Sequence, residues 1–335
     1  MLRKRYKPIL AITMGDPSGI GPEVIVKALS REIGGVYPCV IGDAACLARA
    51  VSLFAPTLLI RPICNLADAL FQPNVLNLLQ AGESVSTVPE YGKPTAEGAT
   101  LALHAMAEAV KRVLSGEVDG ITTAPIHKAN MQAIGFPFPG HTEFFADAAG
   151  TKRFGMMMVG GGLKIMLVTI HLPLKEMIRC LNREQVLETI RLTDRSLRYD
   201  FAIPNPRIAV AALNPHGGEG GILGNEEFFE IAPAVSAAQA EGIPVEGPFP
   251  ADTLFFQLKE GKFDAAVAIY HDQALIPIKL LAFGGAVNVT VGLPFVRTSV
   301  DHGTAYNIAG QGVADAGSLT AALECAAAIV ENRKR

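Results

Sequence analysis

Short apolar runs recur along the chain and alternate with longer segments in which apolar positions are spaced three or four residues apart. The short runs are typical of buried strands, and the longer segments are typical of amphipathic helices. Strands that alternate with helices predict an α/β fold with helices on both faces of the sheet. The predicted strands are residues 8–14, 37–41, 120–123, 155–159, 164–169, 207–211, 265–269 and 286–290. The clearest predicted helices are residues 95–114, 183–198, 226–241 and 318–332.

The first predicted strand runs directly into a glycine-rich turn. The apolar run PILAITM ends where residues 15–21 begin, and a helix follows with Pro22 and Glu23 in its first turn. Strand, turn and helix in this order present backbone N–H groups to an anionic ligand. The turn matches neither the Rossmann nor the P-loop glycine pattern, so by itself it indicates neither kind of site.

Composition and charge limit the class of protein. The chain has 335 residues, of which 50% are hydrophobic and 18% are charged; this excludes a disordered protein and predicts one large or two interlocked α/β domains. A net charge of −3 gives no general basic field for nucleic acid or an anionic membrane, so any phosphate site must be local. The five cysteines form no CxxC pair and are expected to be reduced thiols. No signal-peptide pattern or long apolar stretch is present, so the expected location is the cytoplasm.

Three histidines come shortly after the ends of three predicted strands: His171, His216 and His271. Ligands of open α/β sheets bind beyond the carboxyl ends of the strands, and neutral imidazoles are good ligands for zinc or another divalent ion. A single histidine at a strand end is more often a hydrogen-bonded structural residue. Three in equivalent places favour a metal site with open positions for substrate.

A second group of polar residues suits an anionic small molecule. His141 and Thr142 open a predicted short helix, where backbone N–H groups can bind phosphate or carboxylate, although a simple N-cap by Thr142 explains the pattern equally well. Lys279 lies in an apolar segment and needs an anionic partner. Arg297 carries a planar guanidinium that can bind carboxylate or phosphate through two atoms. Together with Asn288, these residues predict a small phosphorylated substrate.

Two segments near the chain ends resemble the β-decarboxylating dehydrogenases of the isocitrate and isopropylmalate class. Residues 15–24 resemble their N-terminal GDGIGPEV turn, and residues 302–315 resemble their nucleotide loop. The resemblance implies that this loop wraps the adenosine half of NAD or NADP, without a GxGxxG pattern. The cofactor-binding residues that it implies are His302, Gly303, Thr304 and Asn307.

The chain as a whole more closely resembles a sister family, the 4-hydroxythreonine-4-phosphate dehydrogenases of pyridoxal phosphate biosynthesis. Segments that resemble this family occur in order along nearly the whole chain, among them TAPIHK, PGHTEFF, TIHLPL, LNPHGGEGG, GPFPADTLF and YHDQALIPIK. By these motifs, the metal ligands of the family fall on His171, His216 and His271. Its substrate contacts fall on His141, Thr142, Lys279, Asn288 and Arg297.

The resemblance also implies an isocitrate/isopropylmalate dehydrogenase-like fold of two α/β domains with a cleft between them. The first domain is expected to contain residues 1–135 and 312–335, and the second residues 136–311. A homodimer is implied, with an active site completed across the subunit interface and with no nucleic-acid or membrane partner.

The implied reaction is oxidation of the secondary alcohol of 4-phosphooxy-L-threonine by NAD or NADP, followed by loss of CO2 to give 3-amino-2-oxopropyl phosphate. A divalent ion (zinc, magnesium or cobalt) would hold the alcohol oxygen. Asp252, Asp272 and Lys279 are candidates for the general base, and the sequence does not rank them. Two alternatives stay open. One is a paralogue that oxidises D-threonate or D-erythronate 4-phosphate or, more distantly, an aromatic cis-dihydrodiol carboxylate; the other is a metal-dependent hydrolase or lyase.

Overall fold

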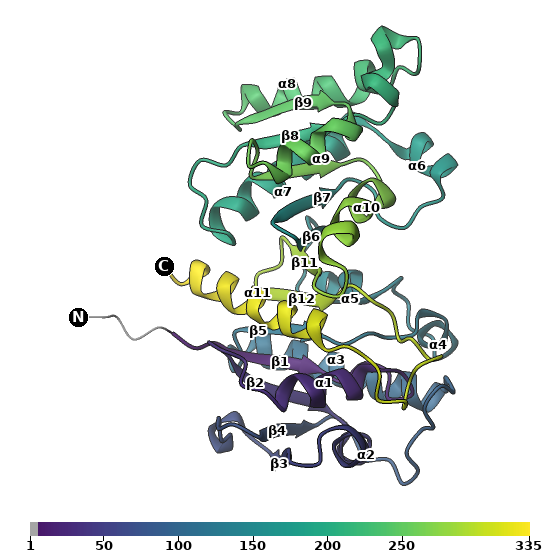
Figure 1. Cartoon of the computed structure of the whole chain (residues 1–335), viewed down its shortest axis with the longest axis vertical. Helices are drawn as coiled ribbons and strands as arrows, with labels where there is room; N and C mark the ends of the chain where they lie inside the picture. Colours follow the sequence, from purple (N-terminus) through teal and green to yellow (C-terminus); the bar gives the residue numbers. More distant parts are fainter. Residues whose placement is uncertain (1–5) are drawn as a thin grey trace, which may run out of the picture. The chain divides into compact units, whose positions relative to one another are not determined.

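The computed structural model describes residues 6–335, which form two compact units. The first unit combines residues 6–152 with residues 293–335, and the second comprises residues 153–292. Figure 1 follows the chain by colour from its purple N-terminal part to its yellow C-terminal helix. The domain boundaries predicted from the sequence lie at 135/136 and 311/312 instead, and they stay a prediction. Within residues 6–335, no helix is both long and apolar enough to cross a membrane.

Among the described residues, the first unit is built on parallel strands. They are β1 Ile9–Thr13, β2 Tyr37–Gly42, β3 Leu59–Ile63, β4 Val75–Gln80, β5 Gly120–Thr123 and β12 Val296–Val300, in the order β3-β4-β2-β1-β5-β12. The helices are α1 Gly21–Leu29, α2 Ala44–Phe54, α3 Ala96–Leu114, α4 Lys128–Ala133, α5 His141–Ala148 and α11 Gly317–Arg333, with a 3₁₀ turn at Leu66–Asp68. In Figure 1, α1 and α11 lie in front of the sheet and α3 lies behind it. Because helices cover both faces, Leu10, Ala11 and Ile12 of β1 are fully shielded from solvent.

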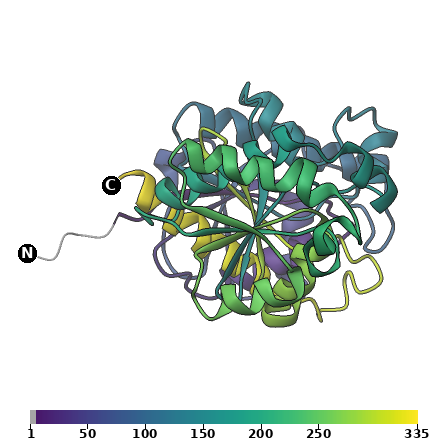
Figure 2. The same ribbon diagram turned by 90° about the horizontal axis from the view of Figure 1, so that it is seen from above.

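The second unit contains a mixed sheet. Its strands are β6 Gly155–Gly160, β7 Leu163–Leu167, β8 Ile208–Ala211, β9 Val245–Phe249, β10 Ala265–Ala268 and β11 Val287–Val291, in the order β11-β6-β7-β10-β8-β9. β6 is antiparallel to its neighbours β7 and β11, and the other pairs are parallel. The helices are α6 Leu174–Cys180, α7 Arg183–Tyr199, α8 Ala232–Ala240, α9 Ala251–Lys259 and α10 His271–Ala282, with shorter turns η2 Pro215–Gly221 and η3 Glu227–Ile231. Figure 2 shows helices on both sides of these strands, and α9 and α10 contribute Leu254 and Ile278 to the core.

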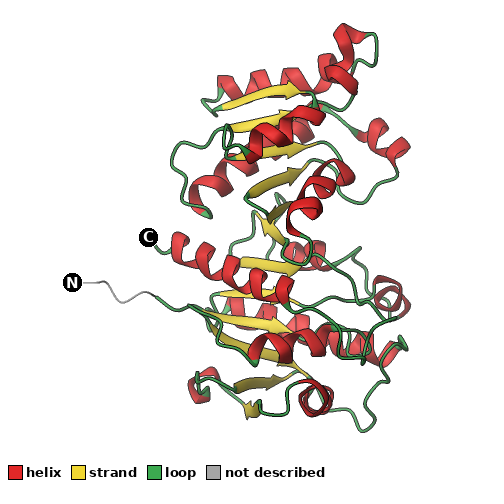
Figure 3. Ribbon diagram, viewed as in Figure 1, coloured by secondary structure: helices red, strands yellow, loops and turns green. Residues whose placement is uncertain are grey.

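The α/β fold class is confirmed, and every predicted strand and helix is present to within two residues at each end. Figure 3 shows the yellow strands of each unit between red helices. Four strands were not predicted from the sequence: β3, β4, β9 and β12. β3 and β9 carry proline and lie at sheet edges, where the apolar pattern is weak. β12 reads as polar (VRTSV), yet all five of its residues are buried. The predicted helix at residues 226–241 begins with the π-helical turn η3 and continues as α8.

Candidate active site

The two segments that resemble the β-decarboxylating dehydrogenases lie against each other in the first unit. The backbone N–H of Ile20 donates to the carbonyl of Thr304 over 3.0 Å. A methyl group added at Gly19 would come within 2.7 Å of the same carbonyl, so only glycine allows this approach. The Tyr306 hydroxyl donates to Asp16 Oδ2 over 2.6 Å. The turn at residues 15–21 and the loop at residues 302–310, which we call the cofactor loop, therefore form one structure.

The cofactor loop presents polar groups that suit a ligand. His302 Nδ1 lies 3.0 Å from the carbonyl of Gly303, so Nδ1 is the protonated nitrogen. His302 Nε2 is buried and has no hydrogen-bond partner among the described residues. A side chain added at Gly303 would meet open space, whereas Thr304 is buried and Asn307 accepts a hydrogen bond from Gln311 at its carbonyl. The orphaned imidazole nitrogen beside an open glycine fits a dinucleotide approaching this loop.

Three of the five predicted substrate residues, Arg297, Thr142 and His141, converge at the N-terminus of α5. Arg297, which is only 1% exposed, donates to Thr123 Oγ1 over 2.6 Å and approaches Thr142 Oγ1 at 3.4 Å. The rings of His141 and Phe145 are parallel, with centroids 6.2 Å apart, and the Arg297 guanidinium lies 5.6 Å from the Phe145 centroid. The N-cap of α5 is Gly140, which makes no side-chain cap. The simple N-cap interpretation of Thr142 is therefore wrong.

The charges and hydrogen-bonding groups of this cluster at α5 favour a bound anion. Burial lowers the pKa of Arg297 to about 9, and nearby Glu143 opposes the shift. Burial, together with the charges of Arg297 and Lys128, holds the pKa of His141 well below its usual value, so the imidazole is neutral at pH 7. His141 Nε2 is buried without a hydrogen-bond partner among the described residues. A phosphate or carboxylate here would meet a guanidinium, an imidazole nitrogen and a helix N-terminus together.

In the second unit, His171 and His271 lie side by side. Their ring centroids are 5.5 Å apart, and both side chains line a surface cavity with Thr169 and Tyr270. His271 Nδ1 lies 2.7 Å from Asp272 Oδ1, which leaves Nε2 to face a ligand. An imidazole whose second nitrogen hydrogen-bonds a carboxylate is the usual arrangement of a metal-ligating histidine. These donors therefore fit a divalent ion of the zinc type.

His216 is not grouped with these two histidines. It begins a run of five residues, 216–220, whose φ angles lie between 45° and 80° and form a left-handed turn. The turn is anchored by the buried carboxylate of Glu227, which accepts from the backbone N–H groups of Leu213 and Asn214. Within residues 6–335, no three His, Cys, Asp or Glu side chains are arranged to hold a metal ion. The structure thus brings together two of the three predicted metal ligands, and the set of three stays a prediction.

The other two predicted substrate residues belong to the second unit. Asn288 lies on β11 with its Nδ2 3.2 Å from Met156 Sδ, and its buried Oδ1 has no partner among the described residues. Lys279 lies half-buried on α10. Of the candidates for the general base, Asp272 is held by His271, and Asp252 is exposed in the first turn of α9.

Three residues of the site were not predicted from the sequence: Thr123, Asp16 and Tyr306. Thr123 ends β5, and the pairing of β5 with β12 brings it to Arg297. No sequence pattern could reveal that contact, because β12 was not recognised as a strand. Asp16 lies within the recognised turn, and its contact with Tyr306 could have been inferred from the resemblance of both ends to one family.

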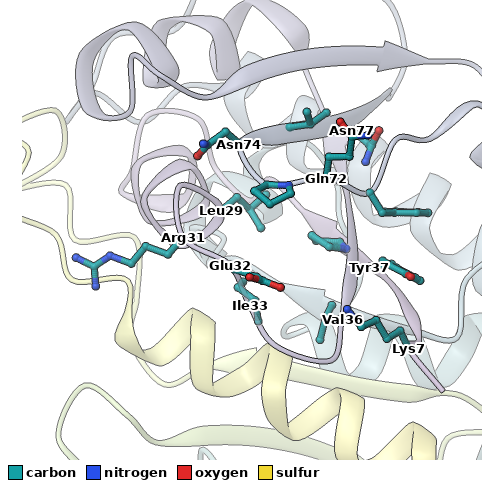
Figure 4. A pocket seen from close by; sticks show the side chains of 14 residues that line it. Lys7, Leu29, Arg31, Glu32, Ile33, Val36, Tyr37, Gln72, Asn74 and Asn77 are labelled. Carbon is teal, nitrogen blue, oxygen red and sulfur yellow. The ribbon is translucent and has the colours of Figure 1, made fainter. Parts of the chain in front are cut away.

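A further cavity in the first unit lies away from all of these residues (Figure 4). Lys7 precedes β1, Tyr37 begins β2 and Val75 begins β4, so the cavity lies at the amino ends of these strands. Ligands of parallel sheets bind at the opposite, carboxyl ends. None of the predicted site residues lines this cavity.

Comparison with known proteins agrees with the resemblance seen in the sequence. The family model "Pyridoxal phosphate biosynthetic protein PdxA" matches residues 36–326. A 4-hydroxythreonine-4-phosphate dehydrogenase of Desulforapulum autotrophicum is 45% identical over 325 residues, covering 96% of this chain and 95% of the relative. The crystal structure of 4-hydroxythreonine-4-phosphate dehydrogenase from Klebsiella pneumoniae superposes with a TM-score of 0.88 at 41% identity, covering 96% of this chain and 99% of that one. A terephthalate 1,2-cis-dihydrodiol dehydrogenase from Burkholderia xenovorans is more distant, with a TM-score of 0.65 at 27% identity, over 96% and 98% of the two chains.

Proposed function

The chain belongs to the PdxA family of pyridoxal phosphate biosynthetic proteins, and on that premise we propose that it oxidises and decarboxylates 4-phosphooxy-L-threonine. It is a dehydrogenase, and the family implies a nicotinamide cofactor. The observation that carries the choice of substrate is the anion site of Arg297, His141 and Thr142 at the N-terminus of α5. A phosphorylated amino acid offers two anionic groups to such donors. The hydrolase or lyase alternative is not retained, because the family is a dehydrogenase.

The reaction divides into two balanced steps. The secondary alcohol loses a hydride to the oxidised nicotinamide and a proton to a base, which leaves a ketone β to the carboxylate. The carbon–carbon bond to the carboxylate then breaks, CO2 leaves, and protonation of the resulting enolate gives 3-amino-2-oxopropyl phosphate. Oxidation must come first, because only the ketone can accept the electron pair that CO2 leaves behind.

The chain's own side chains bind and orient the substrate in this scheme. The Arg297 guanidinium, held by Thr123, forms two parallel hydrogen bonds to one anionic group. The neutral His141 contributes Nε2, and its low pKa keeps a second positive charge out of the buried site. Asn288 and Lys279 are proposed as further substrate contacts, through an amide oxygen and an ammonium group. Fixing both ends of the substrate positions its alcohol for hydride transfer.

A divalent metal ion is proposed at His171 and His271, whose rings lie side by side. Asp272 orients His271 through the hydrogen bond at Nδ1. Such an ion would polarise the alcohol oxygen and stabilise the enolate charge. His216 is proposed as the third ligand, supplied by a second copy of the chain, since its own copy holds it apart from the other two.

The proposed homodimer is supported by an exposed apolar surface on the second unit. Ile276 and Leu280 lie four residues apart on α10, and Phe283 directly follows this helix; the three side chains are 66%, 82% and 86% exposed. On a separate element, η3, Phe228 and Phe229 are also exposed, at 70% and 62%. Large apolar side chains exposed close together along one helix indicate a surface covered by a partner. A second copy is the occupant that also completes the metal site.

Mixing inactive variants tests this arrangement. His171→Ala and His216→Ala chains, unfolded and refolded together, form mixed dimers in which one of the two sites has all three histidines. If about half of the dimers are mixed, activity recovers to about a quarter of the wild-type value. The matched control mixes His171→Ala with His271→Ala, which belong to the same half-site and give no recovery. No recovery in the first mixture would exclude a ligand donated by the second copy.

The substrate is tested against its closest alternative. Initial rates of NADH and NADPH formation are measured with 4-phosphooxy-L-threonine and with D-threonate 4-phosphate. The proposal predicts a clearly higher kcat/KM for the first. Preference for the second would keep the fold and the anion site but assign the chain to sugar-acid oxidation.

The proposed location is the cytoplasm, supported by five cysteines that are all free thiols.

A further inference from the structure

Tyr306 joins the cofactor loop to the opposite end of the chain. Its hydroxyl donates to Asp16 Oδ2 over 2.6 Å, across 290 residues of sequence. Asp16 is 1% exposed and held in place, because its Oδ1 accepts from the Ser18 N–H and its own N–H donates to the Pro125 carbonyl. Burial and the Asp16 carboxylate raise the pKa of Tyr306, so the phenol stays a donor at neutral pH. A hydroxyl bonded to a carboxylate is among the stronger hydrogen bonds in proteins.

Two other segments also approach Tyr306, one at its ring and one at its backbone carbonyl. The imidazole of His127 meets the ring edge to face, with centroids 5.1 Å apart. His127 is itself fixed as the N-cap of α4. A side chain at Gly92 would come within 3.1 Å of the Tyr306 carbonyl, so the loop around Gly92 packs closely against it. Tyr306 is therefore held at its ring by His127 and at its hydroxyl by Asp16.

The loop conformation depends on these anchors. Thr304 is held through its carbonyl by Ile20, and Tyr306 is held through its hydroxyl by Asp16. Ala305, between them, has a φ of 44°, in the left-handed region that alanine disfavours. The chain would relax from this conformation if one anchor were lost. His302, whose Nε2 has no hydrogen-bond partner within residues 6–335, lies on the same loop and would move with it.

From this geometry we propose that Tyr306, paired with Asp16, is a positioning residue that sets the affinity for the dinucleotide. The inference rests on the proposed use of residues 302–310 as the cofactor loop. Tyr306 does not touch the reacting atoms in this account. It holds the loop in the conformation that binds, so that the cofactor does not have to order the loop on arrival.

The test is Tyr306→Phe, which keeps the ring against His127 and removes only the hydroxyl. NADH binding is titrated by fluorescence, and kcat and KM are measured for cofactor and substrate. The dissociation constant and the KM for the cofactor rise about tenfold, since a charge-assisted hydrogen bond is lost. The kcat at saturating cofactor and the KM of the phosphorylated substrate stay within about twofold, because a positioning residue acts on binding alone. Tyr199→Phe, at an exposed ring in the second unit, is the matched control and changes nothing.

Asp16→Asn gives the second arm, because its single amide oxygen cannot accept from both the Ser18 N–H and the Tyr306 hydroxyl. It weakens cofactor binding, and the double variant is weakened by less than the sum of the two single changes. Unchanged NADH affinity in Tyr306→Phe, or additive effects of the two changes, would overturn the inference. Failure of the wild-type protein to bind any dinucleotide would instead refute the cofactor loop itself.

Discussion

Replacing His141 by glutamine should make the free energy of unfolding less dependent on pH below about pH 6.5. In the folded protein the pKa of His141 is held well below 6.5, the value it has when exposed. Below about pH 6.5 the unfolded chain therefore binds a proton here that the folded chain refuses. Acid then favours the unfolded state, and the stability that neutral His141 maintains at pH 7 is lost as the pH falls.

The magnitude follows from that single proton. A difference of one bound proton changes the free energy of unfolding by about 1.36 kcal/mol per pH unit, so between pH 6.5 and pH 5 the loss reaches at most about 2 kcal/mol. Free energies of unfolding are taken from urea titrations between about pH 8 and about pH 5, in buffers without phosphate, because phosphate would bind the cluster at α5.

The quantity compared between wild type and the variants is the slope of the free energy of unfolding against pH. Wild type should lose up to about 2 kcal/mol more than His141→Gln over this interval. His104→Gln, at an exposed position of α3, is the matched control and should follow wild type. Parallel profiles for wild type and His141→Gln would refute the reasoning, because they would show that His141 titrates normally in the folded protein.

Three further predictions test the anion site, the cofactor loop and the dimer. Arg297→Lys keeps a charge but loses the planar fork, so the substrate KM should rise roughly tenfold or more in initial-rate assays; a change below about twofold would argue against bidentate binding. Gly19→Ala places a methyl group 2.7 Å from the Thr304 carbonyl and should weaken NADH binding in a titration while the fold persists. Unchanged binding would show that the turn at residues 15–21 does not support the conformation of the cofactor loop. Phe283→Asp should convert dimers to monomers in sedimentation velocity, whereas Leu59→Asp, also at an exposed side chain, should not. Equal behaviour of the two would remove α10 from the interface.

The sequence was sufficient where chemistry follows directly from strand order. His171 and His271 come after β7 and β10, which prove to be parallel neighbours, so their carboxyl ends lie together and the rings are 5.5 Å apart. The apolar runs located the central strands because such strands are shielded on both faces. The two end segments could be linked in advance because both resemble one family.

Other parts of the site depend on conformation that residue types do not specify. His216 follows β8, the other neighbour of β10, but residues 216–220 form a left-handed turn. His216 is therefore not grouped with the other two histidines. Glycine permits such a turn but does not dictate its direction. The environment of Arg297 depends on the register of β12 against β5, and β12 has no apolar alternation to reveal it as a strand.

The most direct test of the account measures both products of one reaction. Purified protein is given 4-phosphooxy-L-threonine and NAD or NADP, and reduced cofactor and CO2 are followed together, with and without a chelator. Oxidation followed by decarboxylation predicts equal amounts of the two products, and loss of both when the metal is removed. Reduced cofactor without CO2 would contradict the decarboxylation, and turnover that survives complete removal of the metal would contradict the role given to His171 and His271.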